Sequence, residues 1–142
     1  VLNTTGVATR YCTIPPGKAL FFPIINVECS TVEAGDFYGS NEAELRACAT
    51  KDLFALGNLA AEIDGVPVRN LESYGVVSPL FSFTLPENNV LGVAAGSGQS
   101  VSNGYYLMLA PLSVGTHVVH FAGAYTNAGF ALDITYNLTV AP

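Results

Sequence analysis

Charged residues are scarce in this chain, and their scarcity excludes two classes of protein. Only 11% of the 142 residues are Asp, Glu, Lys or Arg, whereas an ordinary domain carries about 25%. Five basic residues cannot form the positive stripe that binds nucleic acid, and eleven acidic ones bring the net charge to −6. Long apolar runs are also missing: the longest, 105–112, falls far below the roughly 18 residues of a membrane span.

Apolar residues, by contrast, are abundant. They make up 50% of the chain and raise its mean hydropathy to +0.41, which excludes a disordered chain. The length predicts a single domain spanning 1–142. Few charges and much apolar surface are typical of an extracellular or cell-surface protein, either a well-packed secreted monomer or a subunit partly buried in an assembly.

Cysteine occurs three times, an odd number. Cys29 and Cys48 each lie at the edge of a polar loop between ordered segments, which predicts a disulfide. Closing that loop of about 20 residues contributes about 3 kcal/mol. Cys12 is left over, as a buried thiol or with a partner upstream of Val1 or on another molecule. No pair has the close spacing of a zinc site, so no metal is expected.

The start of the chain and its sequons both point to export. The chain begins at Val1 without a methionine or a signal-peptide pattern, which indicates a mature form or a fragment. Two Asn-x-Thr sequons, at Asn3 and Asn137, are the predicted glycosylation sites. Their modification requires an extracytoplasmic setting, the same setting that a disulfide favours.

Alternation of apolar and polar residues from Leu132 to Val140 predicts a strand with one face in the core. Its polar face carries Asn137, so this sequon is expected to face solvent. Further strands are predicted at 7–14, 19–27, 61–68, 81–85, 105–109 and 117–122. Because the last three strands are joined by short connections, we expect them to form an antiparallel meander.

Turn-forming residues mark where these strands end or break. Asp64-Gly65 predicts a tight hairpin turn, and Pro67 after it predicts an edge strand. Pro23 predicts a bulge or an edge position within 19–27. The Gly- and Ser-rich segment 92–104 is interpreted as a flexible loop that offers a binding tip.

One helix interrupts the strands. Asn41 is a predicted N-cap with Glu44 three residues later, and Gly57 is placed to end the helix. Apolar residues recur at helical spacing between them, namely Leu45, Cys48, Ala49, Leu53 and Leu56. The pattern as a whole predicts an all-β fold, an antiparallel β-sandwich of jelly-roll or immunoglobulin-like topology with one short helix near 42–56.

Four stretches, 11–29, 78–92, 111–121 and 133–140, together resemble a family of uncharacterised secreted all-β proteins from bacteria and ammonia-oxidising archaea. The resemblance covers most of the chain from Cys12 onward. It implies export and a single all-β domain, and it carries no established activity. It also implies that the domain extends upstream of Val1, where another cysteine would account for the unpaired Cys12.

The two histidines, His117 and His120, are three residues apart on a predicted strand. They therefore lie on opposite faces, and one metal ion cannot bind both. We interpret His117 as a structural residue on the core side and His120 as a surface residue. The alternative is a copper or zinc site that joins one of them to Glu28 or Glu62.

Glu28 and Glu62 lie within apolar strands, an unusual place for a carboxylate. Burial raises the pKa of a carboxyl group and makes it a plausible general acid. Two such groups within roughly 5–10 Å suit glycoside hydrolysis. The alternative is that each faces solvent or pairs with Lys18, Arg10 or Arg69.

No catalytic constellation is assembled in the sequence, which predicts a non-catalytic extracellular protein that needs no cofactor and acts by association. It would be a surface, matrix or filament subunit, or a ligand-binding module. Self-association by strand addition, with Val1–Thr9 as the donor, and binding to other surface proteins are both compatible with this prediction. The alternative is a secreted hydrolytic or metal-dependent enzyme that uses Glu28, Glu62 and a histidine. Carbohydrate binding is a third possibility, through Tyr38, Tyr74, Tyr105, Tyr106 and Tyr125.

Overall fold

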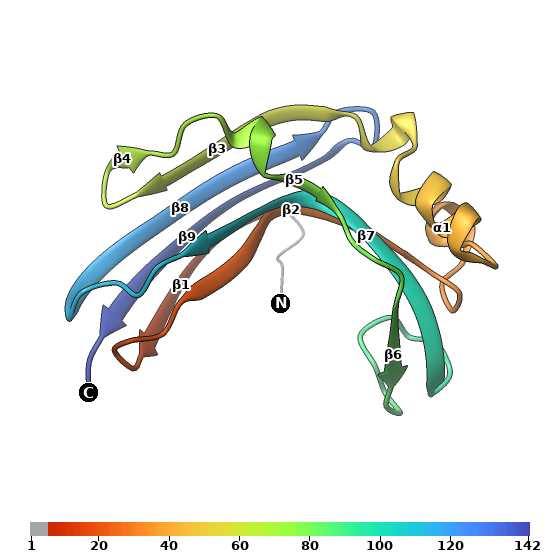
Figure 1. The fold of residues 1–142 in the computed structure, drawn as a ribbon, viewed down its shortest axis with the longest axis horizontal. Helices are drawn as coiled ribbons and strands as arrows, with labels where there is room; N and C mark the ends of the chain where they lie inside the picture. Colours follow the sequence, from red (N-terminus) through yellow and green to blue (C-terminus); the bar gives the residue numbers. More distant parts are fainter. Residues whose placement is uncertain (1–5) are drawn as a thin grey trace.

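Two β-sheets and one short helix make up the fold in the computed structural model, which describes residues 6–142 and, for Leu53, the backbone only (Figure 1). The first sheet contains, in order, β1 (Val7–Ile14), β9 (Phe130–Val140), β8 (Gly115–Tyr125), β3 (Leu56–Ile63) and β4 (Val66–Pro67). The second sheet contains β2 (Leu20–Ser30), β7 (Gly96–Leu109) and β5 (Gly75–Val77), and β6 (Phe81–Leu85) also pairs with β7. The sheets pack together as a sandwich that does not close into a barrel.

The first sheet is mixed, so the expected purely antiparallel sandwich is wrong at one edge. β1 runs parallel to β9, whereas the other pairs of both sheets are antiparallel. The direction follows from the connection, because 15–19 carries the chain from β1 across to β2 in the second sheet instead of turning back beside β1. The choice between jelly-roll and immunoglobulin-like topology is taken up below.

Several predicted strands are confirmed in position and orientation. In β9, Ile134, Leu138 and Val140 are buried, as the alternation requires. Asp64 and Gly65 both adopt positive φ angles and join β3 to β4, which lies at the edge of the first sheet. β2 has a register shift between Pro23 and Ile25 and is an edge strand as well.

The meander and the flexible loop are wrong predictions with one common cause. β7 extends from Gly96 to Leu109, so most of the supposed loop is strand, and β7 lies in the opposite sheet from β8 and β9. Two glycines let neighbours approach this strand closely. A Cβ on Gly98 would lie 2.9 Å from the Phe83 ring, and one on Gly104 would meet the backbone of β2. Their low intrinsic strand preference is therefore outweighed by tertiary packing.

Helix α1 (Glu42–Ala49) starts where the capping pattern places it but is shorter than expected. The Asn41 side chain accepts a hydrogen bond from the Glu44 amide at 3.1 Å, and the Glu44 carboxylate accepts one from the Ser40 amide at 2.8 Å. The chain then enters β3 at Leu56, where pairing with β8 replaces the helix. The remaining helical turns are the 3-10 helices η1 (Gly35–Phe37), η2 (Asp52–Phe54) and η3 (Leu71–Tyr74).

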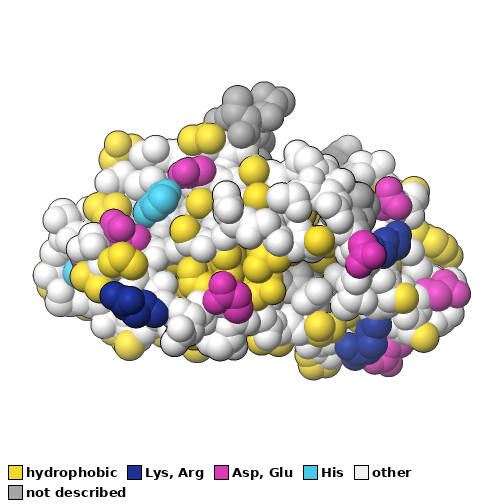
Figure 2. All heavy atoms as spheres, turned by 90° about the horizontal axis from the view of Figure 1, so that it is seen from above, with side chains coloured by type: hydrophobic (Ala, Val, Ile, Leu, Met, Phe, Trp, Pro, Cys, Tyr) yellow, Lys and Arg dark blue, Asp and Glu magenta, His cyan; other side chains and the backbone are white. Residues whose placement is uncertain are grey.

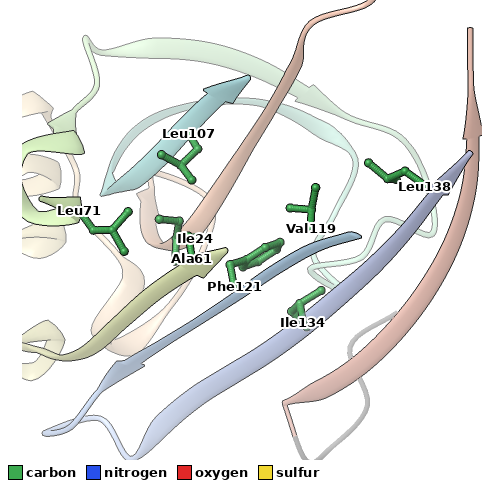
Figure 3. Packing of buried hydrophobic residues seen from close by; sticks show 8 residues of the cluster. All are labelled: Ile24, Ala61, Leu71, Leu107, Val119, Phe121, Ile134 and Leu138. Atoms are coloured by element: carbon green, nitrogen blue, oxygen red, sulfur yellow. The ribbon is translucent and has the colours of Figure 1, made fainter. Parts of the chain in front are cut away.

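The core consists of two clusters. One lies between the sheets, where residues of β8 and β9 face those of β2 and β7 (Figure 3); its buried members are Ile24, Ala61, Leu71, Leu107, Val119, Phe121, Ile134 and Leu138. The other surrounds the predicted Cys29–Cys48 disulfide, which is confirmed and ties α1 to β2. On the face drawn in Figure 2, charged side chains are few and scattered, and hydrophobic ones gather near the middle.

Candidate functional site

An apolar groove of about 710 Å³ opens between the two sheets along β2. Its walls come from four strands and from the residues that lead into β2. The lining residues are Arg10, Cys12 and Ile14; Ala19 to Asn26; Val119 and Phe121; and Phe130, Leu132, Ile134, Tyr136 and Leu138. Volumes of about 300–1,000 Å³ are typical of binding pockets.

The spacing of the lining residues tells which side of each strand faces the groove. On β1 and β9 every second residue contributes, so the inner faces of these strands form the floor. Along 19–26 every residue contributes, so the groove runs beside the edge of β2 and not over one of its faces. A floor of apolar side chains and a wall of strand backbone therefore meet in one place.

The groove exists because the sheets are offset. β2 packs against β8 and β3 of the first sheet, which leaves the inner faces of β9 and β1 beyond its edge. Among residues 6–142, β2 pairs with β7 on one side, and its outer edge carries a single bridge, from Ser30 to Tyr38. An unpaired strand edge beside an apolar surface is the arrangement that recruits another strand.

Two lining residues distinguish the groove chemically. Arg10 is the one charged residue in its lining, which contains no carboxylate. The Cys12 thiol is exposed and belongs to the floor, so the prediction of a buried thiol is wrong. Its exposure leaves it accessible to a thiol probe.

The predicted carboxylate pair is not assembled. Val27 and Cys29 are buried in the core, so Glu28 between them points to the outer face of the second sheet. Glu62 follows the buried Ala61 and points to the outer face of the first sheet, opposite His120 on β8. The two carboxylates thus lie on opposite outsides of the sandwich, and neither lines the groove.

Glu28 lies instead beside Glu33, a partner that the sequence did not reveal. Ser100 donates to the Glu28 carboxylate, and Ser30 donates to Glu33 at 2.9 Å. Ser30 and Ser100 are buried cross-strand partners. Burial raises the pKa of Glu33, the hydrogen bond from Ser30 opposes this rise, and the nearby Glu28 charge adds to it. The cluster holds a proton more readily than a free carboxylate does.

His117 joins two loops and has no free ring nitrogen. Its Nδ1 lies 2.7 Å from Asp64 Oδ2, and its Nε2 lies 2.9 Å from the Ser113 carbonyl oxygen. Both partners are acceptors, so the doubly protonated ring satisfies both bonds. The hydrogen bond to Asp64 is the main cause of a raised His117 pKa, and the same bond lowers the pKa of Asp64. The arrangement supports a structural role for His117, as a clamp between the β3–β4 turn and the loop before β8.

We expect this clamp to make stability depend on pH. A raised histidine pKa stabilises the fold below the ordinary value of 6.5, and the gain is lost as pH rises through the folded value. The lowered Asp64 pKa acts above 3.8 and is lost on acidification, so the pair stabilises most between about pH 4 and 6.5. Thermal unfolding of Asp64→Asn, which keeps a residue suited to positive φ, should lose the decline above pH 6.5 that the parent shows. An unchanged pH profile would contradict the clamp.

The remaining predicted site residues are dispersed. His120 Nε2 lies 2.9 Å from Asp133 Oδ1 on the outer face of the first sheet. Asn137 is half-buried in β9 between β1 and β8, and Asn3 lies outside the described residues. Tyr125 is buried in the core, which raises its pKa to about 12 and removes it from any carbohydrate-stacking surface.

Within residues 6–142, no three His, Cys, Asp or Glu side chains are grouped so that they could hold a metal ion. In the same part of the chain, no helix has the length and apolar character to cross a membrane. Compared with protein-family models, curated proteins and solved structures, the chain has no match. The function is therefore argued from the groove itself.

Proposed function

We propose that the protein is an extracellular, non-catalytic module that acts by association, and that the groove binds an extended apolar segment of a partner chain. The observation that carries the proposal is the course of the groove along the unpaired edge of β2, over the apolar floor of β9 and β1. An added strand would bond its backbone to β2 and place every second side chain on the floor.

The order of the strands supports the same reading of the groove. In an immunoglobulin-like sandwich one sheet has the order G-F-C-C′ and the other A-B-E-D. The order β9-β8-β3-β4 matches the first, and β2-β7-β5 matches B-E-D of the second. We therefore favour immunoglobulin-like over jelly-roll topology. In this scheme the groove occupies the place beside strand B where strand A would lie.

Compartment and charge distribution also support association over catalysis. The Cys29–Cys48 disulfide is consistent with an oxidising space outside the cytoplasm. The alternative enzyme required Glu28, Glu62 and a histidine at one site, and these residues lie on different outer faces. Of the predicted donor segment Val1–Thr9, residues 7–9 pair with β9 within β1, and residues 1–5 lie outside the described part.

The test is a titration with a synthetic peptide of alternating valine and serine, with a glutamate at each end for solubility. Amide NMR signals of 20–26 and 132–138 should shift, and other strands should not. Phe21→Glu should weaken binding about tenfold or more, because a charge replaces a side chain whose burial stabilises by about 1.5–3 kcal/mol.

A matched control comes from the neighbouring strand. Met108 is the cross-strand partner of Phe21, and both are well exposed, at 72% and 66%. Met108 does not line the groove. Met108→Glu should therefore leave the affinity within about twofold. Equal losses in the two variants, or no shifts in the parent, would refute the proposed function.

A further inference from the structure

The loop between β6 and β7 presents an apolar knob, defined as Val90–Ala95. None of its six residues has a polar side chain, and five are exposed. Val90, at its tip, is 96% exposed, more than any other large hydrophobic residue among those described. Such exposure is costly in water unless another surface covers it.

Asn89 holds the knob in a defined shape. Its side-chain amide donates to the Pro86 carbonyl at 3.0 Å and to the Val93 carbonyl at 2.7 Å. Its side-chain oxygen accepts from the Leu91 amide at 3.1 Å, and its backbone carbonyl accepts from Gly92 at 3.1 Å. The loop thus satisfies polar groups internally while its apolar side chains face outward. A preformed shape reduces the entropy lost on docking.

Charge complements the apolar match between knob and groove. Glu87 is the one acidic or basic residue, histidines aside, between Glu72 and Asp133, and it lies three residues before the tip. Arg10 is the one charged residue in the groove lining. An apolar tip with one flanking carboxylate therefore meets an apolar groove with one guanidinium.

Knob and groove cannot meet within one molecule. In Figure 1 the loop that joins β6 to β7 lies at the opposite end of the long axis from β1 and β9. Two different, complementary surfaces at opposite ends give a head-to-tail contact, which propagates instead of closing into a symmetric dimer.

We propose that the partner in the groove is a second copy of this chain, whose knob docks there so that copies join head to tail into a filament. The proposal rests on the proposed function of the groove and adds the identity of the occupant. Val90 and Leu91 lie on the floor, and Glu87 pairs with Arg10 at the mouth.

Cys12 on the floor supplies a covalent test. In Val90→Cys, the knob of one copy should form a disulfide with Cys12 of the next under oxidised glutathione. Because each copy carries both thiols, a non-reducing gel should show a ladder of dimers, trimers and higher species that reductant collapses. Adding Cys12→Ser should reduce the ladder to dimers at most. A cysteine at the equally accessible Val66, which is 66% exposed on β4, is the matched control.

The outcomes separate the possible occupants. A ladder in Val90→Cys that is absent in Val66→Cys supports the knob. Dimers only, linked through Cys12 itself, would mean symmetric pairing at the groove and would overturn the proposal, as would the same ladder in both variants. If the synthetic peptide binds the groove but no ladder forms, the head-to-tail inference fails while the proposed function stands.

A non-covalent measurement covers the charge pair. By sedimentation velocity, Glu87→Arg and Arg10→Glu should each weaken association about threefold, and the double variant should regain most of the loss. Val90→Asp should abolish association without changing the melting temperature, because this side chain makes few contacts in the monomer. Unchanged association in all four variants would overturn the proposal independently of the gel.

Discussion

Removing the Cys29–Cys48 disulfide in Cys29→Ala/Cys48→Ala is expected to lower the free energy of unfolding by about 3 kcal/mol. The bond closes a loop across 19 residues of sequence and ties α1 to β2. Both sulfurs also lie in the second core cluster, with Leu45 and Val101. For a chain of this length the loss corresponds to about 10 °C in melting temperature. Chemical denaturation at neutral pH measures it directly.

The loss should be localised around the helix. α1 has eight residues, too few for an isolated helix to be stable in water. Its amides should therefore exchange faster in the variant, while those of β8 and β9 keep their order of protection. Cys12→Ala is the control and should change stability by less than about 0.5 kcal/mol, because its side chain is exposed. Equal destabilisation by both variants would show that the disulfide is not the cause.

Gly104→Ala is expected to destabilise the fold by about 3 kcal/mol, because the added methyl group meets backbone and not a movable side chain. Its Cβ would lie 2.5 Å from the Ile25 carbonyl oxygen and 2.6 Å from the Asn26 Cα. β2 and β7 would have to move apart at the bulge that follows Pro23. Because Ile25 and Asn26 also line the groove, the variant should bind the valine–serine peptide more weakly as well.

Gly57→Ala provides the comparison. There the nearest atom is the Cγ2 of Thr126, at 2.6 Å, and the other two nearest atoms lie 3.5 Å or more away. A threonine methyl group can move by rotation, so we expect a loss below about 1 kcal/mol. Urea unfolding of both variants tests the difference. A Gly104→Ala protein as stable as Gly57→Ala would mean that β2 does not approach β7 as closely as the structure has it.

Where a pattern reports one local property, the prediction from sequence is confirmed. Alternation along β9 reports which side chains are buried, and it depends only on the two-residue period of a strand. Asp64-Gly65 reports a turn that needs positive φ angles, and Asn41 with Glu44 reports a helix start. The disulfide belongs here too, since its two cysteines flank one loop.

Predictions that depended on distant partners did not hold. Gly98 and Gly104 weaken the strand pattern of β7 locally, yet Phe83 and the backbone of β2 pack against the space they leave. Glu28 and Glu62 look alike in sequence, but their cross-strand neighbours differ and place them on opposite outer faces. Glu33 carries no motif, and only the approach of Ser30 and Glu28 gives it a shifted pKa.

By itself, the sequence determined that this is an all-β protein with a tethered helix, few charges and a disulfide, because composition and short periodic patterns decide those features. The parallel course of β1, the offset of the two sheets and hence the groove were decided only by tertiary structure. Their physical reason is the packing of β2 on β8 and β3, a fit between side chains far apart in sequence, which no local pattern records.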